Sequence, residues 1–223
     1  AERDQRHPRK RHRPVAAGTL PKPHAMGLAV IAAVAGLATG VAISEPLLVA
    51  AIGAYLAISF LYSGVLKHIA GVELVFLASG FLLRVLGGAA ATHVRPSGWF
   101  LLVCSLGAFG VAVAKRYTEL TSLGAAAVVH RPAMRHYRPG VLRVIQWAAG
   151  AAMIAAYLTW AAGEPPGAAP WHLASALPLA AALIRFGVLT GRGKATPVED
   201  LITRDAVMVS CELAWLLLFA AGL

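Results

Sequence analysis

Acidic and basic side chains gather at the start of this 223-residue chain. Glu2 and Asp4 supply carboxylate oxygens, which Mg²⁺ prefers and usually shares with substrate phosphates. A dense basic stretch follows at once, and its side chains can hold phosphate oxygens, among them Lys10, Arg11 and Arg13. This order, just before an apolar segment, predicts a site for a metal ion and pyrophosphate at a membrane surface. The alternative is a polybasic anchor that binds anionic lipid headgroups.

Composition places these residues in a membrane protein. The chain is 58% hydrophobic and only 13% charged, and several apolar runs approach the roughly 20 residues that cross a bilayer as a helix. We predict an all-α polytopic helical bundle that forms a single domain over 1–223. Its seven expected transmembrane spans are 25–42, 46–64, 73–91, 98–114, 141–161, 171–189 and 205–222.

The loops between the spans are unequal in charge. The side that holds 1–24, 65–72, 115–140 and 190–204 carries 17 of the 20 Lys and Arg residues, with Arg143 counted beside the third loop. The positive-inside rule makes this side cytoplasmic. We therefore expect a multi-pass protein of the plasma membrane. Its cytoplasmic face would carry the site, built from a substrate loop at 1–24 and a second loop at 115–140.

The net charge of +10 could suggest a nucleic-acid partner, but in a chain this apolar it indicates basic cytoplasmic loops instead. No nucleic acid is therefore expected. The two cysteines, Cys104 and Cys211, lie inside apolar segments, which argues against a disulfide framework. The sequence leaves open whether the chain forms a homo-oligomer.

Charged residues also occur inside or beside the expected spans. Arg84 would lie about 16 Å along its helix, at a depth where a charge usually faces a polar cavity. Lys115 and Glu119 lie one helical turn apart at the end of the fourth span, so they share a face. They could bind substrate, or they could be an ordinary basic helix end. Arg185, near a span end, could instead reach the headgroups.

The first basic stretch carries a resemblance to a known family. It resembles the end of the first aspartate-rich motif of the UbiA-type intramembrane prenyltransferase superfamily, with Gln5 where an arginine is usual. The matching residues are Asp4, His7-Pro8, Lys10-Arg11, Arg13-Pro14 and Ala16-Ala17-Gly18. The resemblance implies Mg²⁺ as cofactor, with Asp4 as a catalytic ligand. It also implies nine helices, so that two spans and two further aspartates would precede Ala1.

A second motif separates the branches of this superfamily. Most members have Asp-x-x-x-Asp here, whereas Lys115-Arg116-Tyr117, followed by Glu119, resembles the branch that makes decaprenyl-phosphate phosphoribose. The resemblance implies that Lys115 contacts a phosphate directly, and that Glu119 takes a metal-bound water or a ribose hydroxyl. The basic loop and further matching motifs complete the expected phosphate-binding set with Lys67, Arg84, Arg116, Tyr117, Arg135, Tyr137 and Arg143.

The sequence before the last expected span contains a signal for the start of a helix. Thr196-Pro197-Val198-Glu199 reads as a capping box with proline at the first helical position. The segment from Pro197 to Asp205 also resembles a Pro-Glu-Asp…Arg-Asp element of the same branch.

The resemblance implies transfer of 5-phosphoribose from phosphoribosyl pyrophosphate to a polyprenyl (decaprenyl) phosphate, with release of pyrophosphate, for cell-wall arabinan synthesis. Its partners would be these two substrates and membrane lipid. One rival is an aromatic or quinone prenyltransferase of the same superfamily, which should have the second aspartate motif. Another is a transport or lipid-binding membrane protein without enzymatic activity, which should lack a phosphate-binding cytoplasmic face.

Overall fold

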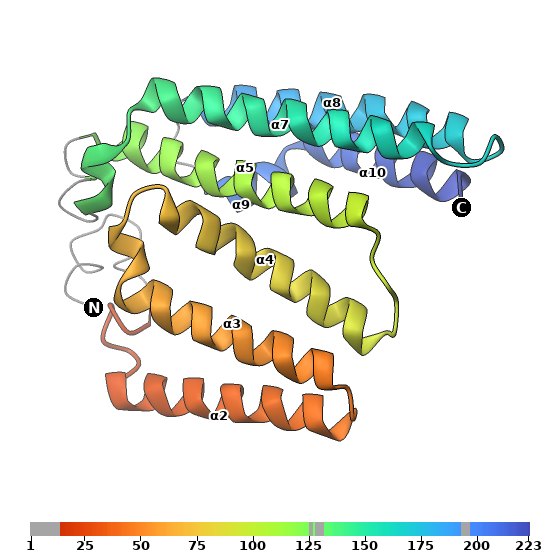
Figure 1. Ribbon diagram of the computed structural model, residues 1–223. Coiled ribbons are helices and arrows are strands. Elements are labelled where there is room, and N and C mark those ends of the chain that lie inside the picture. Colours follow the sequence, from red (N-terminus) through yellow and green to blue (C-terminus); the bar gives the residue numbers. More distant parts are fainter. Residues whose placement is uncertain (1–13, 125–126, 128–131, 193–196) are drawn as a thin grey trace.

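The computed structural model describes residues 14–124, 127, 132–192 and 197–223, and these residues form helices and connecting turns (Figure 1). The long helices are α2 (Lys22–Ala42), α3 (Pro46–Gly64), α4 (Val72–Ala91), α5 (Gly98–Leu123), α7 (Pro139–Ala162) and α8 (Ala169–Gly191). Shorter elements are η2 (Leu66–His68), η3 (Pro132–His136), α9 (Val198–Arg204) and α10 (Ala206–Ala221). The predicted all-α fold class is confirmed.

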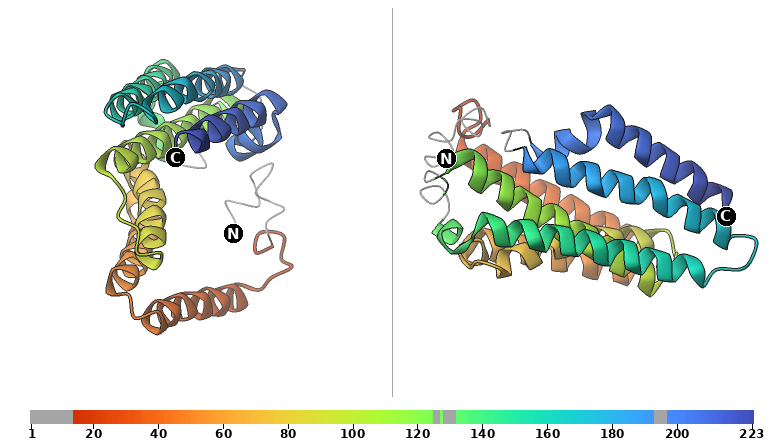
Figure 2. Two further views of the ribbon diagram at one scale, coloured as in Figure 1. Left: turned by 90° about the vertical axis from the view of Figure 1, so that its right-hand side faces the viewer. Right: turned by 90° about the horizontal axis from the view of Figure 1, so that it is seen from above.

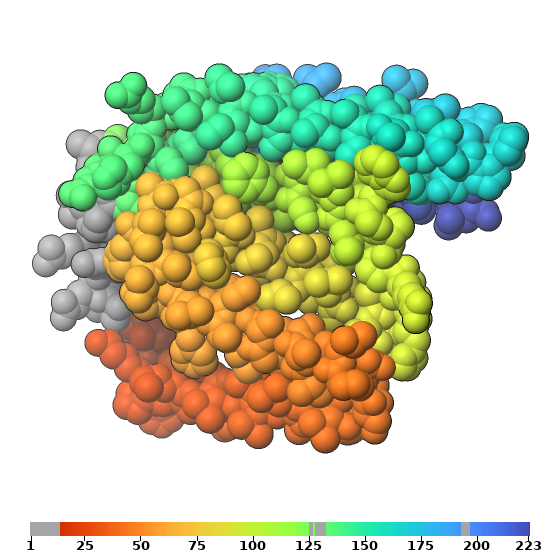
Figure 3. All heavy atoms as spheres, viewed as in Figure 1, coloured from red at the N-terminus to blue at the C-terminus, as the bar shows by residue number. Residues whose placement is uncertain are grey.

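The long helices run side by side along one direction. α2, α3, α4 and α5 follow one another in space as they do in sequence, and α7, α8 and α10 gather beyond α5 (Figure 1). Viewed along the helices, the chain forms an open arc with α2 at one end and α8 and α10 at the other (Figure 2). The space-filling view shows α3 and α4 between the edges formed by α2 and α7 (Figure 3).

The predicted spans agree closely with the observed helices. Within the described residues, six helices are long and apolar enough to cross a membrane, while α10, the seventh predicted span, has only 16 residues. Large apolar side chains such as Val30, Phe60 and Leu217 are exposed on the outer faces. These faces suit lipid, because a bundle in a bilayer gains little by burying them.

Helix α5 extends beyond its predicted end. The span expected over 98–114 continues to Leu123, so the first part of the predicted loop 115–140 is helical. Ser97 caps the start of α5 by accepting a hydrogen bond from the Phe100 N–H at 3.1 Å. The extension places Lys115, Arg116 and Glu119 on a rigid helix, where their spacing fixes their relative directions.

The predicted capping box at 196–199 is not confirmed. Thr196 lies outside the described residues, and α9 begins at Val198 with Pro197 as its N-cap and no side-chain cap bond. The helical structure is interrupted at Asp205, between α9 and α10. The Asp205 carboxylate accepts a hydrogen bond from the Met208 N–H at 3.1 Å and caps α10. α9 is therefore a separate element whose Val198 side chain is buried beside Phe186 and Met208.

The short elements η2 and η3 contact each other at one end of the bundle. Gly71, which precedes α4, has φ +80°, a conformation that glycine adopts without steric cost. Its N–H donates to the Tyr137 hydroxyl at 2.8 Å and so ties η2 to η3. This end also carries the polar termini of α4 and α5.

Candidate substrate cavity

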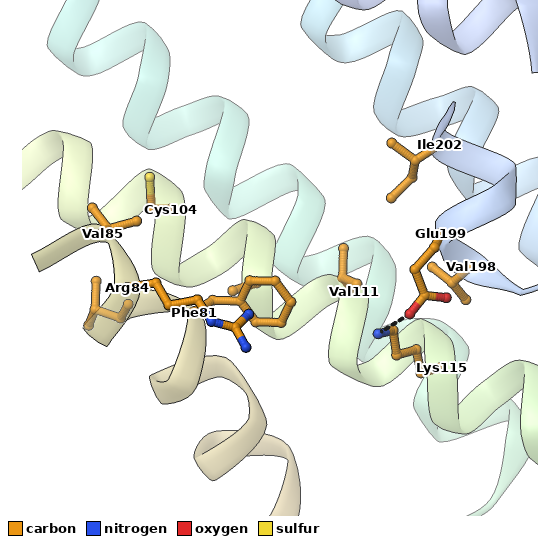
Figure 4. A pocket seen from close by; sticks show the side chains of 11 residues that line it. Phe81, Arg84, Val85, Cys104, Val111, Lys115, Val198, Glu199 and Ile202 are labelled. Carbon is orange, nitrogen blue, oxygen red and sulfur yellow. Dashed lines mark ion pairs between the residues drawn. The ribbon is translucent and has the colours of Figure 1, made fainter. Parts of the chain in front are cut away.

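A cavity of about 470 Å³ lies between α4, α5 and α9. Its walls are mainly apolar and include Phe81, Val85, Cys104, Val111, Val198 and Ile202. Three charged side chains, those of Arg84, Lys115 and Glu199, join these walls (Figure 4). The cavity therefore offers hydrocarbon surface together with two cations, which suits a substrate that carries phosphate on a lipid.

Lys115 is the cation on α5. Its ammonium lies 2.6 Å from Glu199 Oε1, and the Lys115 side chain is 32% exposed (Figure 4). The hydrogen bond from Lys115 lowers the pKa of the Glu199 carboxyl below its ordinary value of 4.5, so Glu199 is ionised at neutral pH. From the sequence, Glu199 was assigned to a helix cap and to a Pro-Glu-Asp…Arg-Asp element. Its pairing with Lys115 was not predicted, because the two positions lie 84 residues apart.

Arg84 is the cation on α4. Its Nη2 donates to the Tyr55 hydroxyl at 2.6 Å, and its guanidinium lies over the rings of Tyr55 and Phe81 at 5.1 and 5.4 Å. Attraction to the ring faces and the hydrogen bond orient the charge within an apolar segment. The structure thus brings the predicted residues Arg84 and Lys115 to one cavity, from two different helices.

A buried polar cluster lies at the ends of α4 and α5. Arg116 Nε donates to Glu73 Oε1 at 2.9 Å, Nη1 donates to Glu119 Oε2 at 2.7 Å, and Nη2 donates to the Tyr62 hydroxyl at 3.2 Å. The Glu73 and Arg116 side chains are 0% and 7% exposed. All three guanidinium nitrogens have protein partners. Arg116 joins α5 to α4 through Glu73, and neither Arg116 nor Glu119 lines the cavity between α4, α5 and α9.

Arg143 and Tyr117, also predicted to bind phosphate, lie in the packing of α5, α7 and α8. Arg143 Nη1 donates to the Gly187 carbonyl at 2.6 Å and to Thr190 Oγ1 at 3.3 Å. Its guanidinium lies over the Tyr117 ring at 5.5 Å. Neither residue lines the cavity between α4, α5 and α9.

The remaining predicted residues that the structure describes lie on the short elements. Lys67 is half-buried on η2, whereas Arg135 is exposed on η3 and donates to His136 Nε2 at 3.3 Å. Tyr137 is half-buried, and its burial raises the pKa of the phenol above its ordinary value of 10.0. These residues border the polar end of the bundle.

The predicted metal site rests on residues that the structure does not describe. Glu2, Asp4, Lys10, Arg11 and Arg13 all lie outside the described residues. Among residues 14–124, 127, 132–192 and 197–223, no three His, Cys, Asp or Glu side chains come together as a metal site. Glu199, whose carboxylate lines the cavity, is paired with Lys115.

Comparisons with known proteins show which family the chain resembles. Residues 1–197 match the UbiA prenyltransferase family. A protein of Mycobacterium tuberculosis named decaprenyl-phosphate phosphoribosyltransferase is 34% identical over 96% of this chain and 71% of its own length. Proteins with the same name from Corynebacterium glutamicum and Mycolicibacterium smegmatis are 34% and 31% identical, and the matches cover 66% and 70% of their lengths.

These matches run through most of the chain, and the family match includes α4 and α5. Together with the six apolar helices of spanning length, they identify an integral membrane protein. The chain belongs to the UbiA prenyltransferase family.

Proposed function

We propose that this protein transfers 5-phosphoribose from phosphoribosyl pyrophosphate to a polyprenyl phosphate and releases pyrophosphate. The observation that carries the proposal is that Lys115 and Arg84 line the same cavity among apolar side chains. A polyprenyl phosphate combines the same two properties, a hydrocarbon chain and an anionic head. The names of the relatives that cover most of the chain support this substrate class.

Lys115 would bind a substrate phosphate directly. An ammonium within an apolar cavity interacts strongly with a phosphate, because little water screens the two charges. The pairing of Lys115 with Glu199 supports this role, since it shows that the ammonium reaches an anion at the cavity wall. The phosphate would take the place of the Glu199 carboxylate, whose side chain is 66% exposed and can turn outward.

Arg84 would stabilise charge deeper in the cavity. Ionisable side chains within transmembrane segments usually mark a substrate path, because their burial is costly. The acceptor phosphate is already anionic, so the reaction needs no strong general base. The transfer rate would depend on cations that stabilise the departing pyrophosphate and on the positioning of the two substrates.

Glu73, Arg116 and Glu119 would act as positioning residues. Their cluster fixes the ends of α4 and α5, which carry Arg84 and Lys115. Lys67, Arg135 and Tyr137, on or beside η2 and η3, would border the same substrate at the polar end of the bundle. Arg143 and Tyr117 would support this end by packing α7 against α5 and α8.

Mg²⁺ would accompany the pyrophosphate group. Carboxylates beside a basic stretch suit an ion that is shared with substrate phosphates, and we propose Mg²⁺ as this ion, with Asp4 and Glu2 as ligands from the chain. Lys10, Arg11 and Arg13 would hold phosphate oxygens beside it. We place the site at the cytoplasmic face of the plasma membrane, because the basic loops lie on that side. The lipid product would serve as a phosphoribose donor for cell-wall arabinan synthesis.

The test is transfer of radiolabel from phosphoribosyl pyrophosphate into a lipid that partitions into organic solvent. Full-length protein in detergent would receive decaprenyl phosphate in one reaction and no lipid in the other. We expect labelled lipid only in the first. Labelling of an aromatic acceptor from a polyprenyl diphosphate, without label transfer from phosphoribosyl pyrophosphate, would overturn the proposal.

A further inference from the structure

The substrate cavity continues along the seam between α4 and α5 into a second cavity. The second cavity, of about 480 Å³, shares Arg84 and Val85 with the substrate cavity and reaches the connection between α4 and α5 at Arg95. Lining positions recur at helical spacing, at 81, 85, 88 and 92 on α4 and at 100, 104, 108, 111 and 115 on α5. Each set shares one face of its helix. The two cavities therefore form one groove along most of α4 and α5, the α4–α5 groove.

Three cationic side chains are distributed along this groove. Lys115 lies about 25 Å along α5 from its first residue, and Arg84 lies about 10 Å before the end of α4. Arg95 lies in the connection between the two helices, at the opposite end of the bundle from Lys115 (Figure 1). The row thus spans most of a hydrocarbon core, which is about 30 Å thick. Because side chains tilt toward the N-terminus of their helix and the two helices are antiparallel, Lys115 and Arg84 incline toward each other.

The charges in the second cavity are accessible and meet no carboxylate there. Arg84 and Arg95 are both exposed, and the Arg84 guanidinium donates to a neutral partner, the Tyr55 hydroxyl. The described residues that line the second cavity also include Thr92 and Ser97, whose hydroxyls can bind an anion, and include no Asp or Glu. An anion in this cavity would therefore meet two guanidinium groups and no described carboxylate.

The borders of the groove are apolar. Phe81 and Phe100, one on each helix, line it and are 43% and 50% exposed. A Cβ atom added at Gly88 would meet no atom within 4 Å, so the groove is open between these two rings. A phosphate in hydrocarbon without a partner is very costly, and cations offset that cost. The groove therefore suits a phosphate headgroup that lies between the cations while its hydrocarbon chain contacts the apolar borders.

We propose that the α4–α5 groove carries the phosphate headgroup of a lipid from one face of the membrane to the other. Arg95 would bind the headgroup at one end, Arg84 would hold it within the bilayer, and Lys115 would receive it at the other end (Figure 4). The movement is passive and runs in both directions, so it needs no energy source. Delivery of polyprenyl phosphate to the transfer site by this route rests on the proposed function, whereas the translocation itself does not.

The test uses full-length protein in liposomes that contain a trace of phosphatidic acid with a nitrobenzoxadiazole label on one acyl chain. Dithionite added outside bleaches the label of the outer leaflet, and further bleaching reports lipid that has crossed from the inner leaflet. With the protein we expect the label of both leaflets to be bleached, and without it that of the outer leaflet alone. Labelled glucosylceramide, which has no phosphate, should keep its inner-leaflet label. Because phosphoribosyl pyrophosphate is absent, failure of the transfer reaction would not change this result.

Two variants test the groove itself. Arg95→Gln should slow the crossing of phosphatidic acid about tenfold, because the phosphate loses a charged hydrogen-bond partner. Arg138→Gln is the matched control, since Arg138 is exposed at the start of α7 and lines neither cavity. Gly88→Leu should block the groove, whereas Gly27→Leu should not, because Gly27 is exposed on α2 and also has open space at its Cβ. Equal crossing of both labelled lipids, or an unchanged rate in Arg95→Gln, would overturn the proposal.

Discussion

The Lys115 ammonium on α5 lies 2.6 Å from the Glu199 carboxylate on α9, and the pair stands at the wall of the substrate cavity. The residue proposed to bind a substrate phosphate is therefore already paired with an anion of the protein. The pairing holds Lys115 toward the cavity. It also means that an incoming phosphate must compete with Glu199.

Glu199→Gln should favour phosphate binding. The amide keeps the shape of the side chain but removes the negative charge that competes for Lys115. Because Glu199 is 66% exposed, solvent screens the pair, and the effect should be modest, up to about 1 kcal/mol or about fivefold in KM for phosphoribosyl pyrophosphate. Initial rates over a range of substrate concentrations would measure it. A raised KM would show that Glu199 orients Lys115 for binding and does not oppose it.

The same pair predicts a pH dependence of stability. The pKa of Glu199 is lower in the folded protein than its ordinary value of 4.5, because Lys115 stabilises the carboxylate. The contribution of Glu199 to the free energy of unfolding is therefore fully present above about pH 6 and disappears as the pH falls through the folded pKa. The melting temperatures of the parent protein and Glu199→Gln should differ slightly at pH 7 and converge as the pH falls through the folded pKa of Glu199. A difference that grows toward acid would contradict this assignment.

The Glu73–Arg116 pair should matter far more for stability. Both side chains are buried, so Glu73→Gln removes one of the two carboxylates that compensate the Arg116 charge, at a cost of up to about 3 kcal/mol. Thermal unfolding in detergent would measure the change. The control is Asp200→Asn, which breaks an ion pair with Arg204 at 3.2 Å on the exposed surface of α9 and should cost about 0.5 kcal/mol or less. Similar small shifts in both variants would show that the Glu73–Arg116 pair does not hold the helix ends.

Arg84→Leu should abolish transfer while membrane insertion survives, because the charge inside the cavity is lost and the helix becomes more apolar. Tyr55→Phe is the matched control, since it removes only the hydroxyl that Arg84 Nη2 contacts and leaves the charge. It should lower the rate by about tenfold or less. Both variants would be assayed for labelled lipid after their yield in the membrane fraction is measured. Near-normal transfer by Arg84→Leu would assign Arg84 a structural role.

The spans could be predicted from the sequence because their apolar runs are long and bounded by Pro, Gly and charged residues. The extension of α5 to Leu123 could not, since the polar residues after 114 resemble a loop although the helix continues through them. The break between α9 and α10 could not be predicted from the sequence either. It depends on Asp205, whose side chain bonds both the Met208 N–H and the Arg185 guanidinium.

The candidate site was predictable in part. Arg84 stood out as a charge in an apolar segment, and Lys115 as part of a motif, and both line the cavity. The buried position of Arg116 was not predictable, because its main partner Glu73 is 43 residues away in the sequence. Lys115 and Arg116 are adjacent in the sequence but differ in burial. Successive helical positions point in different directions, so Lys115 points toward the cavity and Arg116 into the polar cluster.

The most direct test of this account is the transfer rate of Lys115→Ala. Initial rates would be measured against phosphoribosyl pyrophosphate concentration at two Mg²⁺ levels, with the parent protein beside the variant. Loss of a desolvated charge that contacts phosphate costs about 2–5 kcal/mol, so the rate should fall about 30-fold to several-thousand-fold. Extra Mg²⁺ should not restore it, because the contact is direct. Near-normal rates for Lys115→Ala would contradict the account and leave Lys115 as a basic helix end.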